Sequence, residues 1–211
     1  MIMYSRWDLI SSSIILVIII QTSLLHSTAM FQTSNYRDHE SYANSRLEFK
    51  FEYPSDWEIQ ELDAPALSNL KGLVSLVPPK DIHELQAGDV VETPTISITA
   101  ERIRFQNITI DELSRLQSDN IRYMFSDFDF NFENTTEIAI GNNTAIKSVY
   151  TVVDPSTIYH DSESTGIKYG MEILTIRGNT LYTLSYLGEQ DQYFRYLPEV
   201  QSIINSLRFI N

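Results

Sequence analysis

The sequence predicts an α+β fold built on an antiparallel β-sheet of about six or more strands. One observation is the unbroken alternation of apolar and charged residues from Leu47 to Tyr53, which is typical of a strand with one solvent-exposed face. Another is a series of strand-like segments in the second half of the chain. A third is the presence of two segments with helical periodicity. Strands grouped on either side of one helix, with another helix at the end, indicate an α+β sandwich and not βαβ units.

The first half of the expected domain contains several short strands. Residues 54–56 predict a turn after the first strand, and a second strand is expected at residues 57–59. A third is expected at residues 72–77, where two prolines end it. Residues 95–105 also have strand character, but their apolar positions change phase. This change predicts a β-bulge near Glu101.

Two amphipathic helices are expected. Thr109 and Glu112 form a capping-box pattern, which predicts a helix from there to about Phe125. Its expected core side chains are Leu113, Leu116, Ile121 and Met124. A second helix is expected over residues 192–207, because apolar residues recur there at helical spacing. These are Phe194, Leu197, Val200, Ile204 and Leu207.

An antiparallel meander is expected between the two helices. Its strands are predicted at residues 129–140, 145–153, 168–176 and 180–187. Gly178 and Asn179 provide a two-residue hairpin turn between the last two strands.

The N-terminal residues differ from the rest of the chain. Residues 9–25 carry no charge and are long enough either for a membrane-spanning helix or for the apolar part of a secretory signal. Small residues before and at Ala29 provide a cleavage site, so residues 1–29 are a signal peptide or a retained membrane anchor. A buried core helix is a third interpretation. The expected organisation is this apolar segment, a flexible polar linker at 30–45, and a domain at 46–211 that lies outside the cytoplasm.

The composition excludes several functions. The chain has 211 residues, no cysteine and a formal net charge of −13. Without cysteine there are no disulfides, thiolate nucleophiles or cysteine-ligated metal sites. The acidic charge argues against nucleic-acid binding, which depends on Lys and Arg neutralising phosphates. Three N-x-S/T sequons, at Asn107, Asn134 and Asn142, lie in the expected external part and are candidate glycosylation sites.

Four segments resemble the PsbP-like domain family, the fold of extrinsic photosystem II proteins and of a eukaryotic Ran-GTPase-binding regulator. Residues 49–57 resemble its opening F-x-x-x-YP-x-x-W strand and turn. Residues 141–145, 178–184 and 194–209 follow in the order of the family. The resemblance implies an antiparallel sheet with helices on both faces, as in an α/β/α sandwich. It also implies an adaptor or assembly protein, and it supplies no catalytic residue.

The search for chemistry-bearing motifs gives few candidates. Residues 127–131 match the first ligands of a calcium loop, but Phe132 and Ile138 stand where the loop needs Gly and Glu. The better interpretation is a strand with its acidic residues in solvent. A possible cation site consists of His160, Asp161 and Glu163, and a weaker one of His83 and Glu84.

No nucleophile motif and no phosphate-binding glycine loop is visible in the sequence. A Ser-His-Asp site assembled from distant residues stays open, with His39, His83 and His160 as the bases in the expected external part. Several aromatic residues are candidates for a ligand groove or, more simply, for the core. They are Tyr182, Tyr186, Tyr193, Phe194 and Tyr196.

These observations favour a non-enzymatic extracytoplasmic module, membrane-tethered or secreted, that binds a protein partner or stabilises an envelope complex. No cofactor, metal or catalytic residue is assigned. The alternative is an external hydrolase or small-ligand-binding protein with a pocket between sheet and helix. That alternative predicts a concave site with convergent polar groups.

Overall fold

The computed structural model describes residues 38–63, 69–79, 93–103, 108–124, 129–153 and 166–210. Several expectations lie outside these ranges: the apolar segment 1–29, the sequon at Asn107, and the His83 and His160 segments. Among the described residues, no helix has both the length and the apolar character needed to span a membrane.

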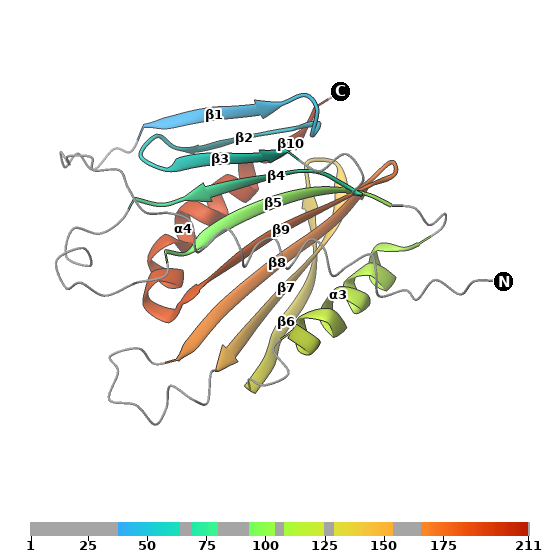
Figure 1. Ribbon diagram of the computed structural model, residues 1–211, viewed down its shortest axis with the longest axis vertical. Helices are drawn as coiled ribbons and strands as arrows, with labels where there is room; N and C mark the ends of the chain where they lie inside the picture. The colour runs from blue at the N-terminus through green and yellow to red at the C-terminus, as the bar shows by residue number, and fades with distance from the viewer. Residues whose placement is uncertain are drawn as a thin grey trace.

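A seven-stranded antiparallel sheet forms the body of the described fold, in the order β3-β4-β5-β9-β8-β7-β6 (Figure 1). Its strands are β3 (Glu58–Asp63), β4 (Leu70–Val77), β5 (Thr95–Arg102), β6 (Asp129–Ile140), β7 (Asn143–Val153), β8 (Ile167–Arg177) and β9 (Thr180–Glu189). The predicted meander is confirmed, since β6, β7, β8 and β9 pair in sequence order. Gly178 has a φ of 60° in the predicted hairpin turn, a conformation that glycine adopts without strain.

A second sheet of three strands has the order β1-β2-β10. It consists of β1 (His39–Asn44), β2 (Phe49–Pro54) and β10 (Arg208–Phe209). β1 corrects the expectation of a flexible linker over residues 30–45, because residues 39–44 pair with β2 along their whole length. The segment resembles a linker because it is an edge strand with mostly exposed side chains. Its half-buried Tyr42 stacks on Phe51, with ring centroids 5.0 Å apart.

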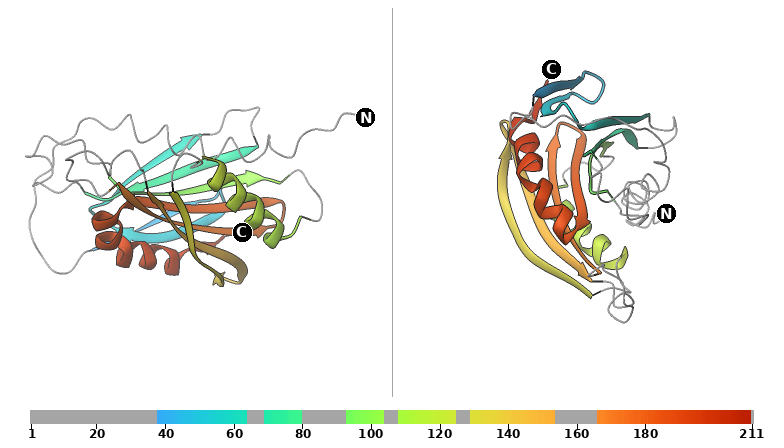
Figure 2. Two further views of the ribbon diagram at one scale, coloured as in Figure 1. Left: turned by 90° about the horizontal axis from the view of Figure 1, so that it is seen from below. Right: turned by 90° about the vertical axis from the view of Figure 1, so that its left-hand side faces the viewer.

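The two helices of the described residues lie on opposite sides of the large sheet (Figure 2). Helix α3 (Ile110–Met124) contacts β7 and β8, and helix α4 (Gln190–Ser206) packs against β2, β8 and β9. The α+β class and the helices on both faces are therefore confirmed. The predicted capping box is also present: the Thr109 N–H donates to Glu112 Oε2 at 3.0 Å, and the Glu112 N–H donates to Thr109 Oγ1 at 3.2 Å.

The main core lies between α4, β2 and the large sheet. Phe49 and Phe51 of β2 are buried there against Val200 and Ile203 of α4. Part of the predicted helical stripe is wrong, because Phe194 is 50% exposed. Tyr193 takes the buried position instead. Two apolar stripes run side by side along α4, and the sheet selects the one that carries the tyrosines.

The predicted bulge in β5 is displaced to the neighbouring strand. β5 stays in register with β9 through Arg102, whereas the pairing with β4 shifts between Leu70 and Gly72, opposite Glu101. A Cβ atom at Gly72 would lie 2.9 Å from the Leu47 Cδ2 atom, so the backbone of β4 lies close to its neighbours there. The apolar residues change phase only at residue 103, after β5 has ended, and the irregularity in the β4–β5 pairing belongs to β4.

Candidate functional site

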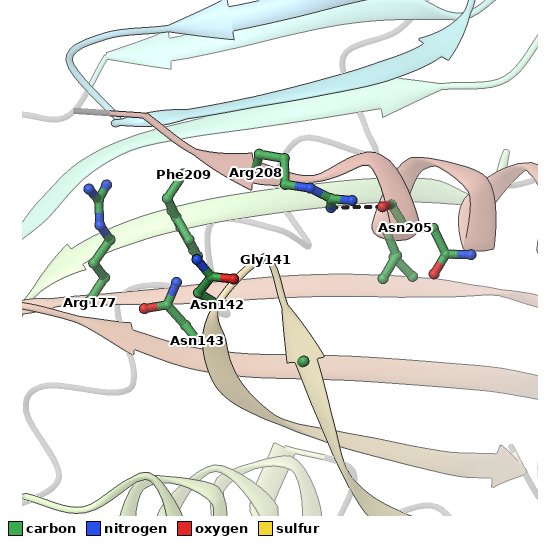
Figure 3. Close-up of a pocket in the computed structure, with 9 residues that line it drawn as sticks. Gly141, Asn142, Asn143, Arg177, Asn205, Arg208 and Phe209 are labelled. Carbon is green, nitrogen blue, oxygen red and sulfur yellow. Dashed lines mark hydrogen bonds between the residues drawn. The ribbon is translucent and has the colours of Figure 1, made fainter.

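A surface cleft of about 810 Å³ lies where the β6–β7 turn approaches the end of α4 and the start of β10 (Figure 3). We call it the hairpin cleft. Its described lining residues are Ala139, Gly141, Asn142, Asn143, Arg177, Ile204, Asn205, Arg208 and Phe209. They come from β6, β7, β8, α4 and β10, so the cleft exists only once the sheet, the helix and the C-terminal strand have assembled.

The β6–β7 turn forms one wall of the hairpin cleft. Gly141 has a φ of 58° at the first position of this two-residue hairpin turn, where glycine is strongly preferred. A Cβ atom at Gly141 would lie 3.8 Å from the Arg208 Cδ atom, so the turn and β10 approach closely. The turn thereby places Asn142 and Asn143 opposite β10.

Two arginines contribute positive charge and are held in place by main-chain carbonyls. Arg208 Nη1 donates to the Asn205 carbonyl at 2.8 Å and to the Leu207 carbonyl at 2.7 Å. Arg177 Nη1 donates to the Ile210 carbonyl at 2.8 Å, and its guanidinium lies 5.5 Å from the centre of the Phe209 ring. The charge of Arg208 also complements the negative end of the α4 dipole. Because a guanidinium has five N–H donors, these bonds leave Arg208 with donor capacity toward the cleft.

The lining is a set of binding groups. Its three asparagine amides can donate and accept hydrogen bonds, its two guanidinium groups donate, and Phe209 adds a ring. None of the nine described lining residues is Ser, Thr, Cys, His, Asp or Glu, the residue types that usually supply a nucleophile or a general base. The hairpin cleft is therefore suited to holding a ligand and carries a local positive charge in a protein of net charge −13.

Comparison with known proteins gives one family. The sequence profile of a family described as "PsbP-like protein" matches residues 13–209 of this chain. The chain belongs to the PsbP-like protein family. This result confirms the resemblance of the four segments described above.

Two solved structures share the PsbP-like fold of this chain. The cyanobacterial PsbP protein CyanoP of Synechocystis sp. PCC 6803 has a TM-score of 0.54 and 12% sequence identity, over 86% of this chain and 98% of that protein. LpqN of Mycobacterium tuberculosis, described as involved in cell envelope biogenesis, has a TM-score of 0.53 and 10% identity, over 84% and 93%. At these identities the likeness concerns the fold. No curated protein sequence matches this chain.

The aromatic residues proposed for a groove mostly belong to the PsbP-like core. Tyr182, Tyr186, Tyr193 and Tyr196 are all buried, and the Tyr186 hydroxyl donates to the Tyr193 carbonyl at 3.0 Å. Phe194 is the exception, and its exposed ring lies 4.8 Å from that of Tyr169. Of these aromatic residues, Tyr182 lines a small internal cavity of about 10 Å³, together with Phe49, Leu184 and Leu207. That volume holds about one water molecule, so it is too small for a substrate.

The other predicted positions are spread over the described fold. His39 is exposed on β1 and is not among the described lining residues of the hairpin cleft. Asp129, Asn131 and Glu133 are exposed on β6, as expected for the solvent face of a strand. Asn134 is exposed on the same strand, whereas the sequon residue Asn142 lines the hairpin cleft. Within the described ranges, no three His, Cys, Asp or Glu side chains are placed to hold a metal ion.

A buried carboxyl group in the PsbP-like sheet was missed by the sequence reasoning. Glu172 of β8 is 5% exposed, and Gln117 Nε2 of α3 donates to its Oε1 at 3.2 Å. Burial raises the pKa of Glu172 to about 7, although the hydrogen bond from Gln117 opposes the change. The signal was available, since Met171, Glu172 and Ile173 place a carboxyl group inside an apolar strand.

Glu172 belongs to a row of polar side chains that crosses the sheet on the α3 face. Its paired neighbours are Ser148 on β7 and Ser185 on β9, and the row continues through Ser97 on β5 to Ser75 on β4. Ser75, Ser97 and Ser148 are buried. None of these residues lines the hairpin cleft, so the buried acid and the candidate site are separate features.

Proposed function

We propose that this chain is a non-catalytic, extracytoplasmic PsbP-like module that binds a protein partner through the hairpin cleft. The observation that carries the proposal is the chemistry of the lining: amide, guanidinium and aromatic groups from five elements converge on a concave surface. Membership of the PsbP-like family supports it, because such proteins generally act as adaptor or assembly factors.

The proposed location rests on the N-terminal sequence. Residues 9–25 are uncharged and apolar, and the small residues at and before Ala29 suit a signal peptidase. The module would therefore be secreted after cleavage at Ala29 or tethered by the retained segment. LpqN, which shares the fold, is described as involved in cell envelope biogenesis, and this role agrees with an envelope location.

Affinity purification of the tagged full chain from detergent-solubilised membranes of its own cells tests the proposal. The blocking variant is Ala139→Trp, which places a large ring in the hairpin cleft from an exposed position on β6. The matched control is Ala43→Trp, also at an exposed position in a strand but on β1, which does not line the cleft.

We expect the wild-type chain and Ala43→Trp to co-purify with the same partner, and Ala139→Trp to lose it. Two results would contradict the proposal. One is purification of the wild-type chain alone and from the cytosolic fraction. The other is equal recovery of the partner with Ala139→Trp, which would place the binding surface elsewhere.

A further inference from the structure

The hairpin cleft has an open strand edge along one side. β10 pairs with β2 through Arg208 opposite Lys50 and Phe209 opposite Phe49, and the Ile210 N–H donates to the Glu48 carbonyl at 2.9 Å. In an antiparallel pair, alternate residues exchange main-chain hydrogen bonds with the partner strand. Since residue 210 bonds toward β2, the N–H and C=O groups of Phe209 point away from it.

That outward direction leads into the cleft. β10 is the outer strand of the sheet ordered β1-β2-β10. In Figure 3 it lies between the strands of that sheet and the β6–β7 turn. Phe209 also lines the hairpin cleft. One donor and one acceptor of the main chain are therefore presented to whatever occupies the cleft, as at other sheet edges that accept an additional strand.

The wall formed by the β6–β7 turn has groups that can hydrogen-bond the other edge of the same ligand. Asn142 of the turn and Asn143 at the start of β7 present side-chain amides, which have the donor and acceptor groups of a peptide bond, and the Asn143 Nδ2 also donates to the Ile140 carbonyl at 3.5 Å. Asn205, at the end of α4 and bonded through its carbonyl to Arg208, adds a third amide on the β10 side. These amides are exposed or half-buried, so a ligand can reach them. The main chain of an extended polypeptide could thus hydrogen-bond the Phe209 main chain on one side and asparagine side chains on the other.

The positive charge of the hairpin cleft favours acidic side chains on the bound segment. Two arginines line the hairpin cleft, and none of its nine described lining residues is acidic. The whole chain carries 28 Asp and Glu against 15 Lys and Arg, so this is a positive site on an acidic protein. Carboxylates are the natural partners of guanidinium groups, which bond them through two parallel N–H donors.

We propose that the hairpin cleft binds an extended, acidic segment of a partner protein by adding it as a strand to the open edge of β10. The Phe209 main chain would pair with the segment, the amides of Asn142 and Asn143 would bond its other edge, and Arg208 would bind a carboxylate. A volume of about 810 Å³ gives room for a short peptide segment. The inference rests on the proposed function and specifies the chemistry of the partner.

Fluorescence anisotropy with the full chain in detergent tests the inference. The probe is a labelled, C-terminally amidated eight-residue peptide in which Thr and Glu alternate. One control peptide has Lys in place of each Glu, which reverses the charge. A second keeps the Glu residues but is N-methylated at every other residue, which removes the main-chain N–H donors along one edge of the extended peptide. A third is N-methylated at the remaining residues, which removes the donors along the other edge.

We expect the acidic peptide to bind and its affinity to fall as the salt concentration rises, because exposed charge pairs are screened. The Lys peptide should not bind measurably. At least one N-methylated peptide should bind about tenfold more weakly, since it loses hydrogen bonds while keeping its charge. Equal affinity of all three Glu peptides would overturn strand addition, and equal affinity of the Lys peptide would overturn the charge assignment.

Variants of the chain place the site. Arg208→Gln and Asn142→Ala should each weaken binding of the acidic peptide about fivefold. Arg115→Gln is the matched control, because Arg115 is an exposed arginine on α3 whose Nε donates to a main-chain carbonyl, as Arg208 does. Circular dichroism shows which variants are folded. If Arg208→Gln does not fold, Asn142→Ala, at an exposed turn position, still tests the site. Unchanged binding by folded variants would overturn the assignment to this cleft.

The test separates this inference from the proposed function. If a partner is captured from membranes in a cleft-dependent manner but the acidic peptide does not bind, the strand-addition inference fails and the proposed function stands. If the chain dimerises in sedimentation experiments and the acidic peptide dissociates the dimer, the occupant is a second copy. That result would overturn the assignment to a partner protein.

Discussion

Replacing the buried acid Glu172 with Gln should stabilise the protein at alkaline pH and remove part of its pH dependence. Burial raises the pKa of Glu172 from 4.5 to about 7 in the folded protein. Its stabilising contribution is therefore complete below pH 4.5 and is lost as the pH rises to about 7. Since each pKa unit is worth about 1.4 kcal/mol, the loss is about 3 kcal/mol.

The neighbourhood of Glu172 supports assigning this loss to one group. Gln117 on α3 and Ser148 and Ser185 on the flanking strands are neutral. Tyr150 interacts with the Glu172 charge; burial, with that charge adding to it, raises the pKa of Tyr150 well above 10, so Tyr150 stays neutral in this range. Glu101, which burial raises to a pKa of about 7, provides a second, independent contribution.

Guanidinium titrations of the full chain at pH 5 and pH 8 measure the effect. The wild-type free energy of unfolding should fall between the two pH values, and Glu172→Gln should reduce that fall by about 2.5 kcal/mol, since part of the loss has already occurred at pH 5. Glu137→Gln, at an exposed position on β6, is the control and should leave the fall unchanged. If Glu172→Gln and the wild type show the same difference between pH 5 and pH 8, the reasoning from burial is refuted.

Two further substitutions test local features of the fold. Thr109→Ala removes one half of the capping box and should destabilise the protein by about 1 kcal/mol. The substitution should speed amide exchange more in α3 than in the sheet, and unchanged exchange in α3 would contradict the role of the cap. Gly170→Ala should cost more than about 3 kcal/mol, because its Cβ would overlap the Tyr150 ring. The comparison is Gly178→Ala, where φ is 60° and no heavy atom lies within 4 Å of the added Cβ, so about 1 kcal/mol is expected. Equal losses at the two glycines, measured by chemical denaturation, would show that the close contact with Tyr150 relaxes.

Elements whose periodicity follows from a single buried face were predictable from the sequence. In β2, Phe49 and Phe51 are buried while Lys50 and Glu52 are exposed, and this is the alternation seen in the chain. Helix α3 begins where its capping box places it. Both signals are local, so one segment of sequence contains all the information needed.

Features that depend on a neighbouring element were not predictable in the same way. β1 forms because β2 offers it a pairing edge, and its own composition gives no apolar pattern. Likewise, the buried face of α4 is chosen by the sheet between two apolar stripes, which is why Phe194 is exposed. The bulge expected in β5 lies in β4 for the same reason.

The hairpin cleft could not be predicted because its residues are distant in sequence and chemically ordinary. Asn142, Asn143 and Arg208 lie in two segments that resemble the PsbP-like family, but that resemblance assigns them no binding role, and Arg177 belongs to no motif. Only the close approach of the β6–β7 turn to β10 brings them together. The sequon at Asn142 marked the turn for a different reason, as a candidate glycosylation site.

Site-specific photo-cross-linking in intact cells tests the central claim most directly. A photoreactive phenylalanine analogue at position 139 would lie in the hairpin cleft, and the same analogue at position 43 would lie on β1, which does not line it. We predict a cross-link to one partner protein from position 139 and none from position 43. The absence of a protein cross-link at 139, or the same product from both positions, would contradict partner binding through this cleft.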